Sequence, residues 1–401
     1  MKITDVAAVS VDLPERRPTT SARRASWNHT APRGLPLNKY DEFPPGLPRA
    51  TPGFVGDAVW VKVTVENGTW GLGRCSFGRP VAALVDDHLG PLMLGQDCFA
   101  TEKLNDMMWQ SSRRHGTAGL SAVAQTGVDL ALWDLKGKLL QQPVWRLLGG
   151  PARDRIPCYV TGDDLDWALE LGFTSFKITN PVHYRQGRKG LDIIEQKIAA
   201  ARAEIGPDYD LMYNPVMSFD VEFTVRLAER VRSYDLRWIE EPVGPEDIDS
   251  LLAIKRAVPW LTLATGEDHH TRHSFARLIN HRCVDIVQPD LQWCGGLTEA
   301  LKIYALAETA SVKVMPHGAM NTPYGQHFVY ALPECDLGEF HLSSPVGVPL
   351  EEVVPIPGMA VPRDGYIVPS DAPGFGIEIP EAALVPWTPT KPGDAGGAGF
   401  W

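Results

Sequence analysis

Apolar residues recur along this chain with two different periods, and the change of period divides it into zones. Residues 3–13 (ITDVAAVSVDL) alternate as a β-strand does, and residues 58–76 (AVWVKVTVENGTWGLGRCS) alternate on both sides of Asn67-Gly68. That dipeptide between alternating runs is typical of a β-hairpin. Residues 119–150 instead carry an apolar face at helical spacing and end on Gly-Gly, which predicts a long helix.

From about residue 156 to 345, short β-rich runs alternate with amphipathic helical segments. The runs are CYVTG, SFKIT, DLMYN, LRWIEE, LTLATGE, VDIVQPD, VKVMPHG and LGEF. Helical segments such as IIEQKIAAARAEIG and LTEALKIYALAETA lie between them. Roughly eight βα units in succession favour an α/β fold built around a (β/α)8 barrel. The later stretch GMAVPRDGYIVPSDAPGFGIEI looks extended, and we expect it to return to the first zone.

Polar residues end five successive predicted strands at nearly constant spacing. Asn214, Glu240, Glu267, Asp290 and His317 follow one another at intervals of 26, 27, 23 and 27 residues. One βα unit per interval places all five at the rim where barrel active sites lie. Each alone is better explained as a turn residue, but five in register favour a site. Oxygen donors on adjacent strands suit Mg²⁺, and Asp290 is placed to orient His317 as a base.

Composition narrows the choice of partners. The 401 residues include 38 basic and 49 acidic ones, a formal net charge of −11, which disfavours nucleic acid and anionic membranes. No window resembles a signal peptide or a membrane span. Six scattered cysteines without a CxxC pair predict free thiols in a reducing compartment, so we expect a cytoplasmic protein.

Several motifs resemble the mandelate racemase subgroup of the enolase superfamily. They are AVAQTGVDLALWDLKGKLLQQPVWRLLGGPARD, MSFDVEFTVRLAERVRSYDLRWIEEPV, TGE, DIVQPDLQWCGGLTEALKI and PHG. Within the subgroup, WCGGLT, PHG and PGFGIE are most similar to the rhamnonate dehydratase branch. The resemblance implies an α+β capping domain over residues 1–150, a modified (β/α)8 TIM barrel over 151–345, and a segment 346–401 that returns to the capping domain. We expect the last dozen residues to be mobile.

The resemblance also assigns roles to individual residues. It implies Mg²⁺ ligands at Asn214, Glu240 and Glu267, and a catalytic dyad of His317 and Asp290. Further substrate contacts are implied at the following positions: His29 and Arg49 in a lid, Lys177, His269 and Glu339. For Lys177 a simple strand-end charge is an equal alternative, and the basic lid segment is also explained as a solvated loop.

Three departures from the family pattern stand out. The first metal ligand is an Asp in the subgroup, whereas this chain has Asn214, which predicts a weakened ligand or a branch with lost or changed activity. The residue after Glu267 tends to be His in the dehydratases, and here it is Asp268. Racemase relatives carry Lys-x-Lys at the second strand, but Thr179 replaces the second lysine. Without a second base, a racemase is disfavoured.

These assignments imply abstraction of a proton next to a carboxylate. We expect an Mg²⁺-dependent dehydratase that removes the C2 proton of an acid sugar and eliminates the 3-hydroxyl, giving a 2-keto-3-deoxy sugar acid. The alternatives are an epimerase or cycloisomerase on the same scaffold, and a catalytically silent relative acting as a binding protein. We also expect a homo-oligomer, because relatives commonly form dimers or octamers.

Overall fold

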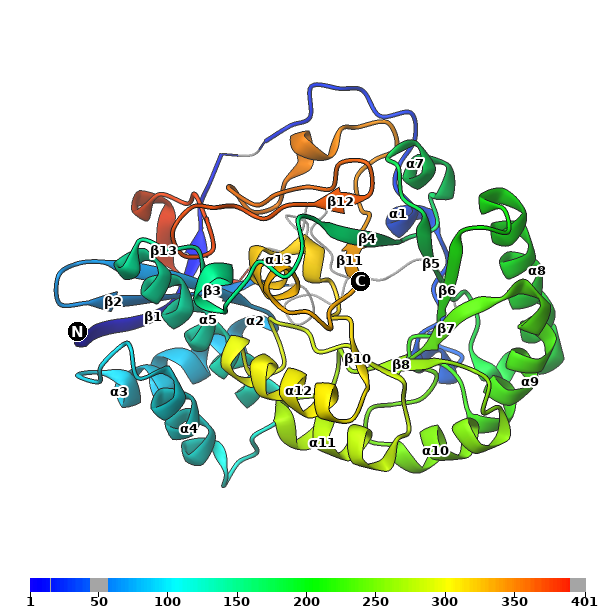
Figure 1. Cartoon of the computed structure of the whole chain (residues 1–401), viewed down its shortest axis with the longest axis horizontal. Coiled ribbons are helices and arrows are strands. Elements are labelled where there is room, and N and C mark those ends of the chain that lie inside the picture. The colour runs from blue at the N-terminus through cyan, green and yellow to red at the C-terminus, as the bar shows by residue number, and fades with distance from the viewer. Residues whose placement is uncertain (15, 44–56, 390–401) are drawn as a thin grey trace.

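An antiparallel four-stranded sheet forms one side of the molecule (Figure 1). The structure, a computed structural model, describes residues 1–14, 16–43 and 57–389. The strand order is β13-β1-β2-β3, with bounds β1 Ile3–Val11, β2 Val59–Val65, β3 Trp70–Cys75 and β13 Leu384–Pro386. β2 and β3 form the predicted hairpin, and Gly68 has φ 82°, the left-handed conformation that suits glycine in such a turn.

Helices cover one face of this sheet. They are α2 Gly78–Ala83, η2 Leu84–Leu89, α3 Gly90–Met93, α4 Thr101–Ser112 and α5 Leu120–Leu140, followed by the short α6 Val144–Leu147. The long helix α5 packs against β3 at very short range, because a Cβ atom on Gly73 would lie 2.0 Å from the carbonyl oxygen of Gly127. Only glycine allows this approach. The helix between the sheet and the barrel is therefore almost wholly buried.

Eight parallel strands curl around the second, larger part of the molecule (Figure 1). They are β4 Ile156–Thr161, β5 Ser175–Thr179, β6 Asp210–Asn214, β7 Leu236–Glu240, β8 Leu263–Thr265, β9 Ile286–Val287, β10 Lys313–Val314 and β11 Gly338–His341. β11 pairs with β4, and within the described residues the pairing path stays open between β10 and β11. Every strand predicted from the apolar runs is present, so the expected fold class is confirmed.

Helices follow the strands in alternation and form the outer layer. They are α7 Leu165–Glu170, α8 Gly187–Ile205, α9 Val221–Val231, α10 Ile248–Ala257, α11 Thr271–His281, α12 Leu297–Thr309 and α13 Pro323–Ala331. The stretch MSFD, residues 217–220, lies before α9. Asp220 is the N-cap residue of α9, because its side chain accepts a hydrogen bond from the backbone N–H of Phe223 at 2.8 Å.

The barrel interior has an apolar floor. Seven buried residues form it: Tyr159, Met212, Trp238, Ala264, Ile286, Met315 and Leu337. Each comes from a different strand or its immediate flank. Since side chains alternate along a strand, residues two positions further on point into the same interior, one layer higher. The floor thus fixes which polar side chains meet above it.

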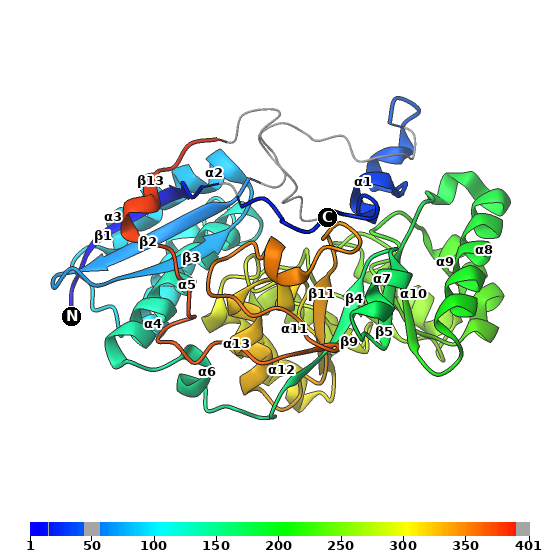
Figure 2. The same ribbon diagram turned by 90° about the horizontal axis from the view of Figure 1, so that it is seen from above.

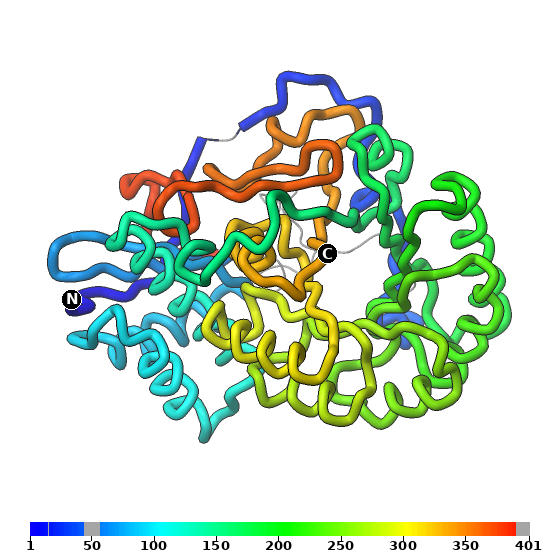
Figure 3. Tube along the Cα trace, in the orientation of Figure 1, coloured from blue at the N-terminus to red at the C-terminus, as the bar shows by residue number. Residues whose placement is uncertain are grey.

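A strand from the N-terminal part of the chain pairs with one from far along the sequence. β13 pairs antiparallel with β1, with Val9 opposite Pro386, and Figure 3 shows the two segments side by side. Figure 2 shows the sheet lying to one side of the barrel. The segment between β1 and β2, where we expected the lid, contains α1 Trp27–Thr30 and η1 Pro36–Lys39. Residues 390–401, expected to be mobile, lie outside the described residues.

Two further features bear on the sequence predictions. All six cysteines are free, as expected, and all are buried. Among the described residues, no helix combines the length and apolar character that crossing a membrane requires.

Asp134 of α5 joins the sheet, the helix and the C-terminal segment. Its buried carboxylate accepts hydrogen bonds from the backbone N–H of Leu72 at 2.8 Å and of Phe375 at 2.9 Å, and pairs with Lys138 at 2.7 Å. We expect Asp134→Ala to lower the free energy of unfolding by about 3 kcal/mol, because two buried N–H groups lose their acceptor. Urea denaturation measures this, with the exposed Asp106→Ala as a control that changes nothing. Equal stability of the two variants would contradict the role.

Candidate active site

A buried ammonium group occupies the centre of the polar layer above the floor. Lys177, on β5, is 1% exposed and forms ion pairs with Glu240 on β7 and, at 2.8 Å, with Glu339 on β11. Burial works against its charge, but the two carboxylates outweigh burial and raise the pKa of Lys177. Glu339 also accepts hydrogen bonds from the hydroxyl of Thr161 and, at 2.9 Å, from the backbone N–H of Gly318. Lys177 is therefore charged and fixed at the base of the site.

His317 and Asp290 form the dyad expected from the sequence spacing. His317 Nδ1 lies 2.8 Å from Asp290 Oδ2, and His317 Nε2 lies 3.5 Å from Glu267 Oε2. Burial would lower the pKa of His317, but the carboxylate of Glu267 and the hydrogen bond to Asp290 raise it to about 10. A carboxylate on Nδ1 fixes the tautomer of an imidazole. This leaves Nε2 to face the interior and exchange protons.

The loop that carries Asp290 is held from the first sheet. The backbone N–H of Gln292 donates to Asp290 Oδ1 at 2.6 Å, and the Gln292 side chain accepts a hydrogen bond from Arg74, at the end of β3, at 3.1 Å. Trp293 donates to the hydroxyl of Ser76 at 3.1 Å, and its ring centroid lies 5.4 Å from that of His317. Both parts of the molecule therefore position the dyad.

Three carboxylates gather at the ends of β7 and β8. Among the described residues, Glu241, Glu267 and Asp268 form the acidic group able to hold a metal ion, with one oxygen of each lying within 4.8 Å of the others. Burial is the main cause that raises the pKa of all three, to about 8 for Glu267. Both oxygens of Glu241 and one of Asp268 are buried without a hydrogen-bond partner in the described part of the chain. Such a group is costly unless a cation joins it.

Asn214 lies where the spacing predicts, at the end of β6, and faces Glu240. Its amide nitrogen donates to Glu240 Oε1 at 2.8 Å, and its amide oxygen accepts from the backbone N–H of Val216 at 2.7 Å. A carboxylate needs a donor and a backbone N–H needs an acceptor, so both partners demand the same orientation of the amide. Asn214 thus lies beside Glu240 but turns its oxygen toward its own loop.

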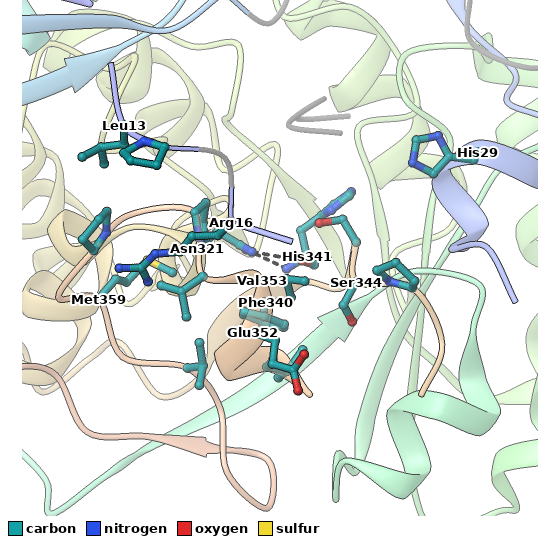
Figure 4. Close-up of a pocket in the computed structure, with 18 residues that line it drawn as sticks. Leu13, Arg16, His29, Asn321, Phe340, His341, Ser344, Glu352, Val353 and Met359 are labelled. Atoms are coloured by element: carbon teal, nitrogen blue, oxygen red, sulfur yellow. Dashed lines mark hydrogen bonds between the residues drawn. The ribbon is translucent and has the colours of Figure 1, made fainter. Parts of the chain in front are cut away.

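The lid residue His29 lines a cavity of about 480 Å³ between the lid and the end of β11. His341, Asn321 and Arg16 also line it, and Figure 4 shows His29 entering from α1, apart from the other labelled side chains. His341 is two residues beyond Glu339 on β11, so the cavity adjoins the polar layer. Arg49, the other lid residue predicted to contact substrate, lies outside the described residues.

Two other positions singled out in the sequence, His269 and Thr179, contact residues outside the dyad. His269 is buried with its ring centroid 5.8 Å from that of Phe275 on α11, and burial lowers its pKa to about 4. Thr179 donates to Asp163, and Lys197 pairs with that carboxylate at 2.8 Å. A substrate contact by His269 stays a prediction.

Some residues of the site were not found from the sequence. Gln288 and Trp238 donate to Glu240 Oε2 at 2.7 and 3.0 Å. Gln288 lies two residues beyond the floor residue Ile286, so strand alternation could have revealed it. Glu241 could not be found in this way, because it directly follows Glu240. Its φ of 45° breaks the alternation and lets two consecutive carboxylates enter the interior.

Comparison with known families agrees with this architecture. Residues 54–149 match the family described as mandelate racemase / muconate lactonizing enzyme, N-terminal domain. Residues 163–383, more than half of the chain, match the family described as enolase C-terminal domain-like. The chain belongs to the mandelate racemase subgroup of the enolase superfamily. The resemblance of the motifs to that subgroup is thus confirmed.

Individual superfamily members extend the likeness over most of the chain. An L-rhamnonate dehydratase of Saccharopolyspora erythraea is 37% identical over 356 residues, covering 87% of this chain and 90% of that protein. The crystal structure of L-rhamnonate dehydratase from Gibberella zeae has a TM-score of 0.85 at 31% identity and covers 96% of both chains. The 3,6-anhydro-D-galactonate cycloisomerase of Zobellia galactanivorans has a TM-score of 0.73 at 26% identity, covering 96% of this chain and 100% of that one.

In this superfamily member, Lys177 is the counter-charge of two buried carboxylates, which yields a test. We expect Lys177→Met to lower the free energy of unfolding in EDTA by about 4 kcal/mol, because Glu240 and Glu339 lose a buried partner. Chemical denaturation followed by circular dichroism measures the loss. The control is Lys189→Met on the exposed face of α8, which should leave the midpoint unchanged. If Lys177→Met matches this control, the ion pairs do not stabilise the fold.

Proposed function

We propose that this protein is an Mg²⁺-dependent acid-sugar dehydratase that acts on L-rhamnonate or a stereochemical neighbour. The observation that carries the proposal is the dyad of His317 and Asp290, at 2.8 Å, facing a group of buried carboxylates. The 37% identity to an L-rhamnonate dehydratase supports the choice of substrate class. A crystal structure of the Gibberella zeae enzyme complexed with Mg, 30% identical to this chain, supports the choice of cation.

The oxygen donors present fit a hard divalent cation. Mg²⁺ takes carboxylate and amide oxygens, and the rim offers Glu267 together with either Asn214 and Glu240 or Glu241 and Asp268. Unpartnered buried oxygens on Glu241 and Asp268 favour an ion at this rim. A bound cation would hold the substrate carboxylate and stabilise the negative charge that develops when the C2 proton leaves, as metal ions in enolase-superfamily sites do. It would also offset the negative charge of the acids that raise the pKa of His317.

His317 performs the proton transfers. Asp290 holds Nδ1, so Nε2 takes the proton from C2 of the aldonate. As the C3–O bond breaks, His317 Nε2 returns this proton to the departing 3-hydroxyl, which leaves as water. The enol that remains tautomerises to the 2-keto-3-deoxy acid. One base serves both steps, which agrees with the lack of a second lysine at Thr179.

The remaining residues bind and orient the substrate. Glu339, fixed by Lys177, Thr161 and the N–H of Gly318, is the contact for the polar end that approaches β11. A cavity of about 480 Å³, lined by His29 and by Phe340 and His341 next to Glu339, is within the usual size of small-molecule sites and is our candidate for the space that takes the hydroxylated end of the acid. His29 then serves as a lid contact. A place in carbohydrate catabolism follows from this chemistry.

A substrate screen tests the function. Purified protein with millimolar Mg²⁺ is offered L-rhamnonate and its stereochemical neighbours, and the 2-keto acid product is measured. We expect product from at least one of them, and its loss when EDTA removes the cation. His317→Asn should lower kcat about 10³-fold, whereas His281→Asn on the exposed end of α11 should leave it unchanged.

Two results would contradict the proposal. Absence of product from every aldonate would favour a silent relative that binds without turnover. Full activity of His317→Asn would show that another group removes the C2 proton, even if the dehydratase activity itself is present.

A further inference from the structure

Arg33 is a buried arginine whose guanidinium group makes no hydrogen bond within the described part of the chain. The residue is 8% exposed, and its Nε is buried without a partner. Its Cζ lies 4.8 Å from the centroid of the Trp27 ring, a contact with the face of the ring that occupies no N–H group. An arginine side chain has five N–H donors, and a buried cation that uses none of them is unfavourable. Acceptor oxygens of a ligand would remove this penalty.

The acid nearest in its effect on Arg33 already has other partners. Burial lowers the pKa of Arg33 to about 10, and the carboxylate of Asp163 opposes this change. Asp163 itself accepts hydrogen bonds from the hydroxyl and backbone N–H of Thr179 and pairs with Lys197 at 2.8 Å. Arg33 is therefore a cation at neutral pH, and its donors are available.

The segment that carries Arg33, residues 27–34, is fixed to the ends of the barrel strands, and we call it the roof. The backbone N–H of Gly34 donates to the carbonyl oxygen of Asn180, just after β5, at 2.7 Å. The Trp27 ring covers Gly162, just after β4, so closely that a Cβ atom there would collide with the indole nitrogen. These contacts place Arg33 over the ends of β4 and β5.

His341 lies between the roof and the polar layer of the site. Its ring centroid is 5.1 Å from that of Trp27, and it lines the cavity of about 480 Å³. The residue comes two positions after Glu339 on β11, so its side chain points to the same side of the strand, one layer higher. Burial and the charge of Arg33 lower the pKa of His341 to about 3. An uncharged imidazole thus lies near the guanidinium group.

The layer below the roof comes from the same strands. Thr161 on β4 and Lys177 on β5 both contact Glu339 on β11, and the backbone N–H of Gly318, next to His317, donates to Glu339 at 2.9 Å. In the proposed reaction, C1 to C3 of the acid lie at the carboxylates and His317. The carbons beyond C3, which we call the far end, carry hydroxyl groups that need partners of their own. The roof supplies unused donors one layer above Glu339.

We propose that Arg33 is a specificity-determining residue whose guanidinium group donates hydrogen bonds to the hydroxyl groups at C4 and C5 of the acid sugar. Trp27 supports the guanidinium group, and His341 borders the same subsite. The proposal rests on the proposed function for the identity of the substrate and adds a selection for acids that continue beyond C3. A site built to hydrogen-bond a hydroxyl group discriminates against analogues that lack it, because its buried donors are then left unpaired.

Ligand binding without turnover tests this role. Isothermal titration calorimetry in millimolar Mg²⁺ gives the affinity of His317→Asn protein for L-rhamnonate and for glycerate, which keeps the first three carbons and ends there. Adding Arg33→Met should weaken L-rhamnonate binding about 10²-fold, because charge-assisted hydrogen bonds are lost. Glycerate binding should stay within about 2-fold, since this ligand has no far end.

Two further variants calibrate the result. Arg33→Lys keeps the positive charge but lacks the planar fork of donors, so we expect it to weaken L-rhamnonate binding about 10-fold. The control Arg188→Met alters an exposed arginine at the start of α8 and should change the affinity for neither ligand.

Steady-state kinetics of the active enzyme gives a second readout. Loss of a contact that is made equally in the ground state and the transition state raises KM and leaves kcat unchanged. Arg33→Met should therefore raise KM for L-rhamnonate about 10²-fold, with kcat within about 3-fold of the wild type. A fall in kcat together with weaker binding of both ligands would assign Arg33 a structural role and overturn the inference. Unchanged affinity for L-rhamnonate would overturn it as well.

The product assay separates this inference from the proposed function. Wild-type protein that yields no 2-keto acid, while the variants show the expected binding pattern, refutes the dehydratase alone. Product from L-rhamnonate with the same KM in Arg33→Met and wild-type protein refutes the role of Arg33 alone.

Discussion

The ammonium group of Lys177 is the interaction on which the interior of the barrel depends. It lies within a layer of acids that would otherwise repel one another, and it links β5 to β7 and β11 through Glu240 and Glu339. The floor beneath supports it, because Trp238 donates to Glu240 and packs edge-on against Tyr159. Because the Lys177 ammonium group pairs with Glu240 and Glu339, the oxygens of the other acids at the rim of the barrel are available to other partners.

A second constraint comes from outside the barrel. Thr126 on α5 accepts a hydrogen bond from the backbone N–H of Gly295, and Asp129 accepts one from that of Thr298 at the start of α12. Together with the contacts from the end of β3 to Gln292 and Trp293, these bonds fix the loop that begins at Asp290. The dyad therefore depends on the docking of the first sheet and its helices. A substitution where the first sheet and its helices contact the barrel would therefore shift His317 without altering any residue that faces the substrate.

The sequence was sufficient to predict which residues lie in the barrel interior wherever side chains alternate regularly along a strand. Met212, Trp238 and Met315 lie in the floor, and two residues later come Asn214, Glu240 and His317, as the period of two requires. Long amphipathic helices such as α8 and α12 were recognised for the same reason, since their packing follows from their pattern.

Prediction from the sequence failed where the backbone departs from this regularity. Positive φ values at Val216, Met217 and Glu241 redirect the chain just after β6 and β7, and no apolar pattern encodes such a turn for non-glycine residues. The state of each oxygen was also hidden. Whether Glu240 or Glu241 has lone pairs to spare depends on Gln288 and Trp238, which approach from neighbouring positions in space. Spacing along the sequence therefore predicted which residues lie at the rim of the barrel. Which of these acids has free oxygens depends on the hydrogen-bond donors around each of them.

The pairing of β13 with β1 has a consequence for the newly synthesised chain. β1 leaves the ribosome well before its partner, which spans residues 384–386 and follows the whole barrel. Until then one edge of β1 has exposed N–H and C=O groups, which can pair with the strand of another molecule. The barrel has time to fold while this edge waits. A chain released by a ribosome that stalls between the barrel and β13 would thus keep this open edge and be prone to aggregate.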